Sequence, residues 1–232
     1  MRVVRGRAPT VAEDRDVTRR LLDEVAEGDE PAVRVWAPHR QLAFGRRDAH
    51  EDGYEAARVA AEEHGFEPVE RSVGGRAVAY DGETTLAFAR ITHIDDMRRG
   101  MDERYEALTV DVQRALSRLG VAAERGEPAD SYCPGRHSLQ CEGKLVGIAQ
   151  RVRRGAAITS GVCIVANHEE LARVLDAVYR ALGVPFDPDS VGSVERAGGT
   201  SDVDTVRESL EDALVEDVVG KGEPARVEQL DA

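Results

Sequence analysis

The chain has 232 residues, with 44 acidic and 31 basic side chains and a formal net charge of −13. This balance disfavours binding to nucleic acid or to an anionic membrane, because phosphate contacts need clustered lysines and arginines. The length suits one domain with a substantial core and does not by itself require a second.

Helical and extended segments alternate in the first third of the chain. Residues 13–26 have apolar side chains at helical spacing and acidic residues in the first turn, which predicts an amphipathic helix. Residues 32–46 alternate like two paired strands around a Pro-His turn, and residues 52–66 predict a second helix that ends at Gly65. The pattern indicates α mixed with β.

The middle of the chain continues this mixture. Two strand candidates, residues 76–80 and 84–91, are joined by the turn Asp81-Gly82. Residues 102–119 carry a long apolar helix face. Three extended segments follow, which we expect to form a meander of strands: 138–145, 146–152 and 156–165.

The last part of the chain changes composition. Residues 169–182 predict an amphipathic helix stopped by Gly183, and the segment after Pro188 is rich in Gly, Ser, Asp and Glu. One more helix and then a frayed acidic end are expected there, from the spacing of Val203, Val206, Leu210, Leu214 and Val218. We therefore predict an α/β (α+β) fold with a catalytic domain at 1–188 and an acidic C-terminal extension with a short helix at 189–232.

Cysteine usage and hydropathy bear on the compartment. The three cysteines, at positions 133, 141 and 163, are an odd number without CxxC spacing, which argues against a disulfide framework and a zinc site. The histidines form no ligand pattern with carboxylates, so we assign no metal. The N-terminus lacks the apolar core of a signal peptide, and no apolar run approaches the roughly 18 residues of a membrane span. A cytoplasmic protein with no membrane partner is expected.

Lysine is almost absent from this chain. Only Lys144 and Lys221 are lysines among the 31 basic residues. Acidic excess, few lysines and few aromatic residues are typical of proteins kept soluble in concentrated salt, so we expect a halophilic source. A surface role could be filled by arginine, whereas a compact ammonium at a carbonyl could not. Lys144 is therefore a candidate functional residue.

The segment RSVGGRAVAY, residues 71–80, joins an arginine to two adjacent glycines. Adjacent glycines let the backbone approach a ligand closely and leave amide groups free for a carboxylate or phosphate. Arg71 is suited to balance such an anion, although a Gly-Gly pair is also ordinary turn punctuation. The segment is not a P-loop, because the GxxxxGK[ST] pattern is missing.

The segment GKLVGIAQ, residues 143–150, places Lys144 between small residues. Such a lysine can present its ammonium to a carbonyl oxygen while the backbone runs beside an extended acyl chain. The alternative is a hairpin whose lysine faces solvent.

Cys133 lies in the turn-prone segment SYCPGRH, whereas the other two cysteines lie in strand-like apolar runs that favour a packing role. Arg136, His137 and Lys144 follow closely, and nearby cations favour the thiolate that attacks a thioester or an amide. His137 is a candidate base or a surface histidine. A structural loop cysteine remains the alternative for Cys133.

Together these segments resemble the biotin/lipoate A/B protein ligase superfamily, on its lipoate ligase and octanoyltransferase side. WAPHRQLAFGR is similar to the family's Trp-Pro-to-Gly-Arg segment, RSVGGRAVAYDGETTLAF to its acyl-binding loop, and GKLVGIAQR to its lysine motif. The resemblance covers about 17–186. It implies a mixed sheet flanked by helices, similar to the catalytic cores of class II aminoacyl-tRNA synthetases and biotin ligases.

The resemblance also implies the site residues. Cys133 and Lys144 would be catalytic, with the lysine gripping the acyl carbonyl. A further set would line the tunnel for a lipoyl or octanoyl chain: Arg71, Ser72, Gly74, Gly75, Ala77, Tyr80, Gly147 and Ala149.

Two departures from the family's pattern and one cysteine bear on which branch of the family the chain resembles. The glycine loop reads Val-Gly-Gly-Arg, where ATP-dependent ligases have three glycines, and Tyr80-Asp81 stands where many members have His-Asp. Cysteine-dependent octanoyltransferases and lipoyl-domain amidotransferases carry a nucleophile just upstream of the lysine motif, where this chain has Cys133. Ligases need an accessory C-terminal domain, which a separate accessory subunit could supply.

Three functions follow as hypotheses. The leading one is a cofactor-free acyltransferase of protein lipoylation, in which a Cys133 thioester passes an octanoyl or lipoyl group to a lysine of a lipoyl-domain protein. The acceptors would be the glycine-cleavage H protein or the 2-oxoacid dehydrogenase E2. The second is a lipoate–protein ligase that uses lipoate and MgATP and forms lipoyl-AMP. The third is a catalytically idle module that binds a lipoyl domain or a biotin-like ligand.

The halophilic interpretation makes a prediction about stability. Below molar KCl the surplus carboxylates repel one another, so the thermal midpoint should rise as KCl increases from about 0.1 M to about 2 M and the charges are screened. Calorimetric scans along a KCl series measure this. A thermal midpoint that stays flat across the series would contradict it.

Overall fold

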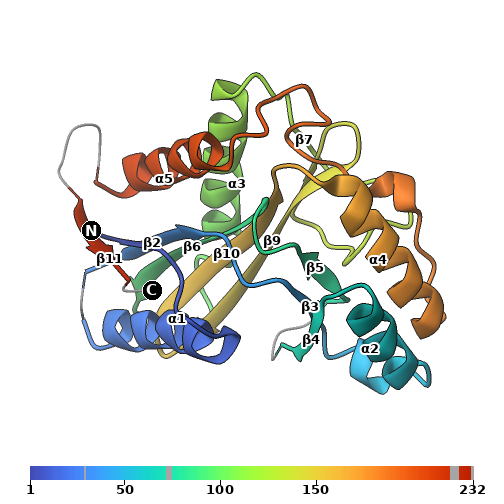
Figure 1. Ribbon diagram of the computed structural model, residues 1–232. Coiled ribbons are helices and arrows are strands. Elements are labelled where there is room, and N and C mark those ends of the chain that lie inside the picture. Colours follow the sequence, from blue (N-terminus) through green and yellow to red (C-terminus); the bar gives the residue numbers. More distant parts are fainter. Residues whose placement is uncertain (29, 72–74, 220–224, 231–232) are drawn as a thin grey trace.

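The structure is a computed structural model that describes every residue except 29, 72–74, 220–224 and 231–232 (Figure 1). In the described part, eight strands form a mixed sheet in the order β11 (Arg226–Gln229), β1 (Arg2–Arg5), β2 (Ala32–Trp36), β6 (Thr85–Ile94), β10 (Gly155–Ile164), β9 (Lys144–Arg153), β8 (Ser138–Gln140) and β7 (Glu124–Arg125). A second sheet has the order β4 (Glu67–Glu70), β3 (Gln41–Phe44) and β5 (Val78–Tyr80).

Helices cover both sheets. One face of the large sheet packs on α1 (Val11–Ala26), and the opposite face packs on α3 (Met101–Arg118) and α5 (Val203–Val219) (Figure 1). The small sheet packs on α2 (Tyr54–Glu63) and α4 (His168–Leu182), and two short 3₁₀ turns lie at Asp48–His50 and Pro188–Ser190. The predicted mixed sheet flanked by helices is confirmed. In the described residues, no helix is both long and apolar enough to cross a membrane.

Two predicted strand pairs are wrong, and the difference builds the site. Strands β2 and β3 were expected to pair around the Pro-His turn, but β2 pairs with β1 and β6, while β3 pairs with β4 and β5. The turn after β5 likewise leads into the other sheet. This turn is not a two-residue hairpin turn, because one carboxylate oxygen of Asp81 accepts hydrogen bonds from the backbone N–H groups of Glu83, Thr84 and Thr85 at 2.8–3.1 Å. The chain therefore crosses between the sheets twice.

The meander after α3 is confirmed, with one shift of boundary. Strands β8, β9 and β10 are antiparallel neighbours. The first break falls at 141–143, before the predicted one, and the register slips between Leu139 and Gln140. As a result Lys144 is the first residue of β9, next to the loop that carries Cys133.

The C-terminal segment contains the expected helix and an unexpected strand. Helix α5 buries Val206, Leu210, Ala213 and Leu214 in the same core as the large sheet. Where a frayed end was expected, β11 adds parallel to β1. The domain boundary at 188 stays a prediction.

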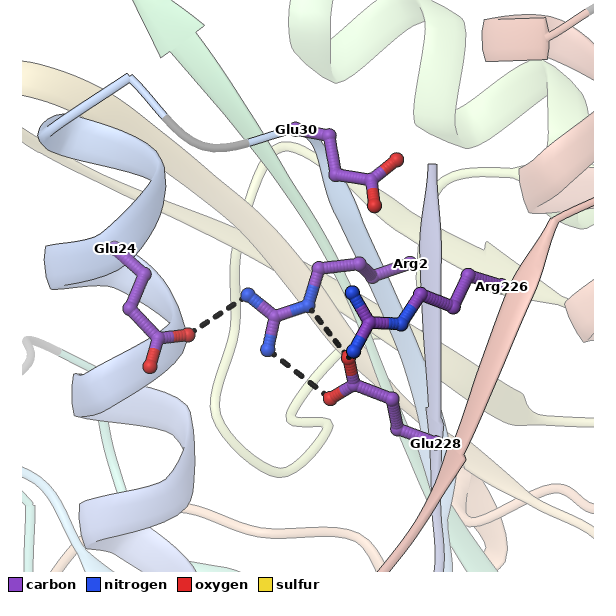
Figure 2. Close-up of a pocket in the computed structure, with 5 residues that line it drawn as sticks. All are labelled: Arg2, Glu24, Glu30, Arg226 and Glu228. Atoms are coloured by element: carbon purple, nitrogen blue, oxygen red, sulfur yellow. Dashed lines mark hydrogen bonds and ion pairs between the residues drawn. The ribbon is translucent and has the colours of Figure 1, made fainter.

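Charged side chains tie this added strand to the first one (Figure 2). Arg2 on β1 donates to both carboxylate oxygens of Glu228 on β11, at 3.2 and 3.1 Å, and to Glu24 on α1, at 2.8 Å. Glu30 and Arg226 complete the lining of a cavity of about 310 Å³. The N-terminal ammonium of Met1 pairs with Glu30, so three cations face three carboxylates. We therefore assign the cluster to holding β1, β11 and α1 together.

Candidate active site

Cys133 lies in the loop between β7 and β8, with its backbone in the left-handed region at φ 40°. Its sulfur accepts a hydrogen bond from Nη2 of Arg71 at 3.1 Å. Its backbone N–H donates to the hydroxyl of Tyr179 at 2.7 Å. A non-glycine residue at positive φ is uncommon and needs surroundings that hold it there. Cys133 is therefore held both at its sulfur and at its backbone.

Gly75 lets the sulfur approach the backbone. A Cβ at this position would lie 2.8 Å from Sγ of Cys133 and 3.0 Å from Nη2 of Arg71, and the residue has φ +97°. Gly45, directly after β3, lets Gly75 approach in the same way, because a Cβ at Gly45 would lie 2.0 Å from the carbonyl oxygen of Gly75. Only glycine fits at both positions, so the predicted glycine loop and the predicted nucleophile meet.

Arg71 is partly buried beside the sulfur, and its Nη2 also donates to the carbonyl of Arg76. Its Nε is buried and has no hydrogen-bond partner among the described residues. Burial works to lower the pKa of Arg71, but the Cys133 sulfur and Tyr80 outweigh it and raise that pKa above its usual value. The guanidinium is thus a fixed positive charge at the thiol.

Tyr179 on α4 links the cysteine loop to β5. Its buried hydroxyl accepts the N–H of Cys133 and donates to the carbonyl of Ala77 at 3.0 Å. Burial raises the pKa of the Tyr179 phenol far above its usual value, so the hydroxyl stays protonated and can do both. The predicted site residue Ala77 therefore reaches Cys133 through this tyrosine.

Lys144 is 1% exposed, and its ammonium points into the cysteine loop. Nζ donates to the backbone carbonyls of Tyr132 at 3.0 Å and Cys133 at 2.9 Å, and to Oε2 of Glu127 at 2.7 Å. An ammonium has three hydrogens, so all three donors are used. The predicted pair of cysteine and lysine is brought together, but through the cysteine's backbone oxygen.

Glu127 is the counter-ion of this buried lysine. Its carboxylate also accepts from the hydroxyl of Ser138 and the N–H of Gly135, both at 2.9 Å. Burial works to raise the pKa of Glu127, but Lys144, Ser138 and Gly135 outweigh it and lower that pKa. Our sequence reasoning missed Glu127 and Tyr179. A buried lysine needs a paired carboxylate, which was the signal for the first, whereas nothing local pointed to the second.

The other predicted substrate-binding residues lie at varied distances from the thiol. Tyr80 ends β5, where burial raises the pKa of its phenol and both Arg71 and Cys133 lie within electrostatic reach. Gly147 lies three residues after Lys144 on β9, and a Cβ there would lie 3.6 Å from the lysine's Cε. Ala149 is exposed on β9. Ser72 and Gly74 fall outside the described residues.

The remaining candidates do not join the site. His137 stacks on Tyr105 of α3 with ring centroids 3.8 Å apart, and burial lowers its pKa. Cys163 is fully buried, which raises its pKa to about 12 and keeps the thiol protonated. Among the described residues, no group of three or more metal-ligating side chains is close enough to hold an ion.

Residues 11–215 match the family described as the lipoyl protein ligase A/B catalytic domain. The chain belongs to this family. Curated relatives include proteins named octanoyl-[GcvH]:protein N-octanoyltransferase from Exiguobacterium sibiricum and Bacillus velezensis. Both are 33% identical to this chain, the first over 158 residues and the second over 166. The matches cover 65% and 69% of this chain. They cover 55% and 57% of those proteins, so the chain spans little more than half of their length.

Solved structures of the family share the fold. The Thermoplasma acidophilum protein Ta0514 with bound lipoic acid superposes with a TM-score of 0.71 at 20% identity, and lipoate-protein ligase A bound with ATP does so with 0.72 at 21%. Each comparison covers 99% of this chain and 89% of the other. At these identities the likeness shows the fold, and the predicted superfamily is confirmed by the family match.

The close approach at Gly75 makes a prediction. Gly75→Ala should slow alkylation of Cys133 by iodoacetamide at least tenfold, because the new methyl group displaces the sulfur or the guanidinium. Gly198→Ala is the matched control: Gly198 also has positive φ, at +84°, but a Cβ there meets nothing within 4 Å. Both variants carry the backbone strain of roughly 1 kcal/mol. Equal alkylation rates in the two variants would contradict the proposed packing.

Proposed function

We propose that this protein transfers an octanoyl or lipoyl group through a thioester on Cys133 to a lysine of a lipoyl-domain protein. The observation that carries the proposal is the contact at 3.1 Å between Nη2 of Arg71 and Sγ of Cys133, at the glycine loop of the family. A cation at a sulfur favours the thiolate, which is the nucleophilic form. The names of the curated relatives, octanoyltransferases, support the same reaction.

The reaction would run in two balanced steps. The Cys133 thiolate attacks the carbonyl carbon of the donor's acyl group, the S–C bond forms, and the bond to the donor's nitrogen or sulfur breaks. The leaving group takes a proton from solvent. In the second step the neutral amine of the acceptor lysine attacks the thioester, the N–C amide bond forms, and the S–C bond breaks. The nitrogen gives up one proton to solvent, and the thiolate is restored. Neither step consumes ATP, because the donor already carries an activated or transferable acyl group.

The partners follow from the same proposal. We infer lipoyl-domain acceptors, namely the glycine-cleavage H protein or the 2-oxoacid dehydrogenase E2, working with this chain in the cytoplasm. The names of the relatives include GcvH, and one similar structure is a bi-partite lipoate protein ligase with its E2 lipoyl domain. No cofactor is needed for the transferase.

A lipoate–protein ligase is the second candidate, because the fold matches lipoate-protein ligase A bound with ATP. That reaction would need lipoate and MgATP, would form lipoyl-AMP, and would not need a cysteine. A separate accessory subunit would then assist this chain. The fixed position of Cys133 favours the transferase.

The intact mass of the protein separates the two. After mixing with an octanoylated lipoyl-domain donor without ATP, the parent protein should gain the mass of one octanoyl group, and Cys133→Ser should not. Transfer to an acceptor should fall at least a thousandfold in Cys133→Ser, since the nucleophile is lost.

Cys141→Ser is the control, because Cys141 is also partly exposed but lies outside the site. It should keep the adduct. An acyladenylate formed only with MgATP, with full transfer in Cys133→Ser, would make the protein a ligase.

A further inference from the structure

A second cavity lies at the edge of the large sheet, where the ends of β1 and β2 meet α5 and β11 (Figure 1). Its volume is about 490 Å³, against about 310 Å³ for the cavity in Figure 2. The turn after β5 also contributes to its lining, through Gly82. None of the residues that line it belongs to the candidate active site.

The charged side chains that line this cavity in the described part of the chain are all arginines: Arg5, Arg7 and Arg207. They gather in a protein whose acidic side chains outnumber the basic ones, with a net charge of −13. In the cavity of Figure 2, by contrast, three cations face three carboxylates. The partners of each arginine decide whether the second cavity carries a surplus of positive charge.

Arg5 and Arg207 share one buried carboxylate, that of Glu211. Nε of Arg5 donates to both oxygens of Glu211, at 3.1 and 3.0 Å, and Nη1 of Arg207 lies 3.6 Å from Oε2 of the same group. Arg207 also donates to Asp204 and Glu208, at 3.3 and 3.4 Å, but these two side chains are mostly exposed. Solvent screens such surface pairs strongly. One buried carboxylate therefore serves two guanidinium groups.

Arg7 has no carboxylate partner among the described residues. Its Nη1 donates to the backbone carbonyls of Pro38 at 3.1 Å and Gly82 at 3.0 Å, with a longer contact to Ala37 at 3.4 Å. These contacts hold the guanidinium in place, and within the described ranges its Nε and Nη2 make no hydrogen bond to protein. A guanidinium carries five N–H donors in a planar fork that matches a carboxylate or a phosphate. Arg7 is thus a fixed cation with donors to spare.

The rest of the lining suits a ligand with an apolar part. Val35, Trp36 and Ala37 line the cavity from the end of β2, and Val35 is buried. Gln229 adds a side-chain amide next to Gly6, where a Cβ would lie 2.9 Å from Nε2 of Gln229. Sites for small molecules have volumes of roughly 300–1,000 Å³, so the space exceeds what a bare ion needs. Surplus positive charge, free donors and an apolar wall thus occur together.

We propose that this cavity is a binding site for a small organic anion, a carboxylate or a phosphate ester with an apolar body. Arg7 contacts the oxyanion, Arg5 and Arg207 add positive charge, and the end of β2 contacts the apolar body. The bound anion contacts β1, β2, α5 and the turn that leads out of the small sheet, so its binding stabilises the fold. The site is independent of the proposed acyl transfer, because it shares no residue with the candidate active site.

The test is isothermal titration calorimetry of the whole chain with three probes at one ionic strength, which keeps charge screening the same. The probes are phenyl phosphate, phenylacetate and the neutral 2-phenylethanol. At least one of the two anions should bind with a dissociation constant of about 1 mM or tighter. The alcohol should bind at least tenfold more weakly, because it forms no charge-assisted hydrogen bond. Tighter binding of phenyl phosphate assigns the site to phosphate esters, and tighter binding of phenylacetate assigns it to carboxylates.

Arg7→Gln should weaken binding of the anion at least fivefold, whereas Arg7→Lys, which keeps the charge, should weaken it less. The lysine variant guards against a folding defect. Arg154→Gln is the matched control, because Arg154 is exposed in the turn between β9 and β10 and has no ion pair in the described part of the chain. It makes the same change in net charge and should leave the dissociation constant within about twofold of the parent.

Three results would overturn the proposal: no binding of either anion, binding of the alcohol as tight as that of the anions, or equal weakening in Arg7→Gln and Arg154→Gln. An anion that binds at the candidate active site instead would keep its affinity in Arg7→Gln, which also overturns it. Failure of the acyl-adduct experiment would remove the proposed function and leave these affinities as they are.

Discussion

The buried ammonium of Lys144 is the constraint on which the site depends. Removing a charge from water costs several kcal/mol, and the cost is offset only when all of its hydrogens are bonded and an opposite charge is near. Here two of the three acceptors are backbone carbonyls of the cysteine loop, and the third is Glu127. The loop cannot move away without leaving the ammonium unsatisfied. The position of Cys133 therefore depends on this charge, together with the contacts from Arg71 and Tyr179.

Two sheets contribute to the site, and the cysteine loop lies between them. Lys144 begins a strand of the large sheet, whereas Gly75 leads into the small sheet and Tyr179 comes from the helix packed on that sheet. The two crossings of the chain between the sheets bring these parts together. Close packing of glycine on the sulfur then leaves room for a guanidinium at contact distance. The residues around Cys133, namely Lys144, Gly75 and Tyr179, therefore come from separate elements of the fold.

Much of this could be predicted from the sequence, for identifiable reasons. The long helices have an apolar period over three or more turns, so their existence and type follow from spacing. Cys133 and Lys144 are eleven positions apart around a turn and a short strand, which makes their proximity a local matter. The rarity of lysine in the chain singled out the residue that is indeed buried beside the cysteine.

The rest depends on long-range pairing. Strands β2 and β3 are adjacent in sequence and fully or nearly fully buried, a pattern that fits partners in the same sheet as well as in different ones. The contact between Tyr179 and Cys133 joins residues 46 positions apart, and no hydrophobic period or sequence motif predicts it. The acceptors of Lys144 are likewise invisible, because two of them are main-chain atoms that any residue would provide. Sequence thus indicates the reacting residues better than it indicates what each one touches.

The central claim is that a thioester on Cys133 lies on the path of transfer. The most direct test isolates the octanoylated protein free of donor, mixes it with an apo lipoyl-domain protein without ATP, and follows both intact masses in time. The account predicts that the octanoyl mass leaves this protein and appears on the acceptor lysine at equal rates. An adduct that persists while the acceptor stays unmodified would contradict it.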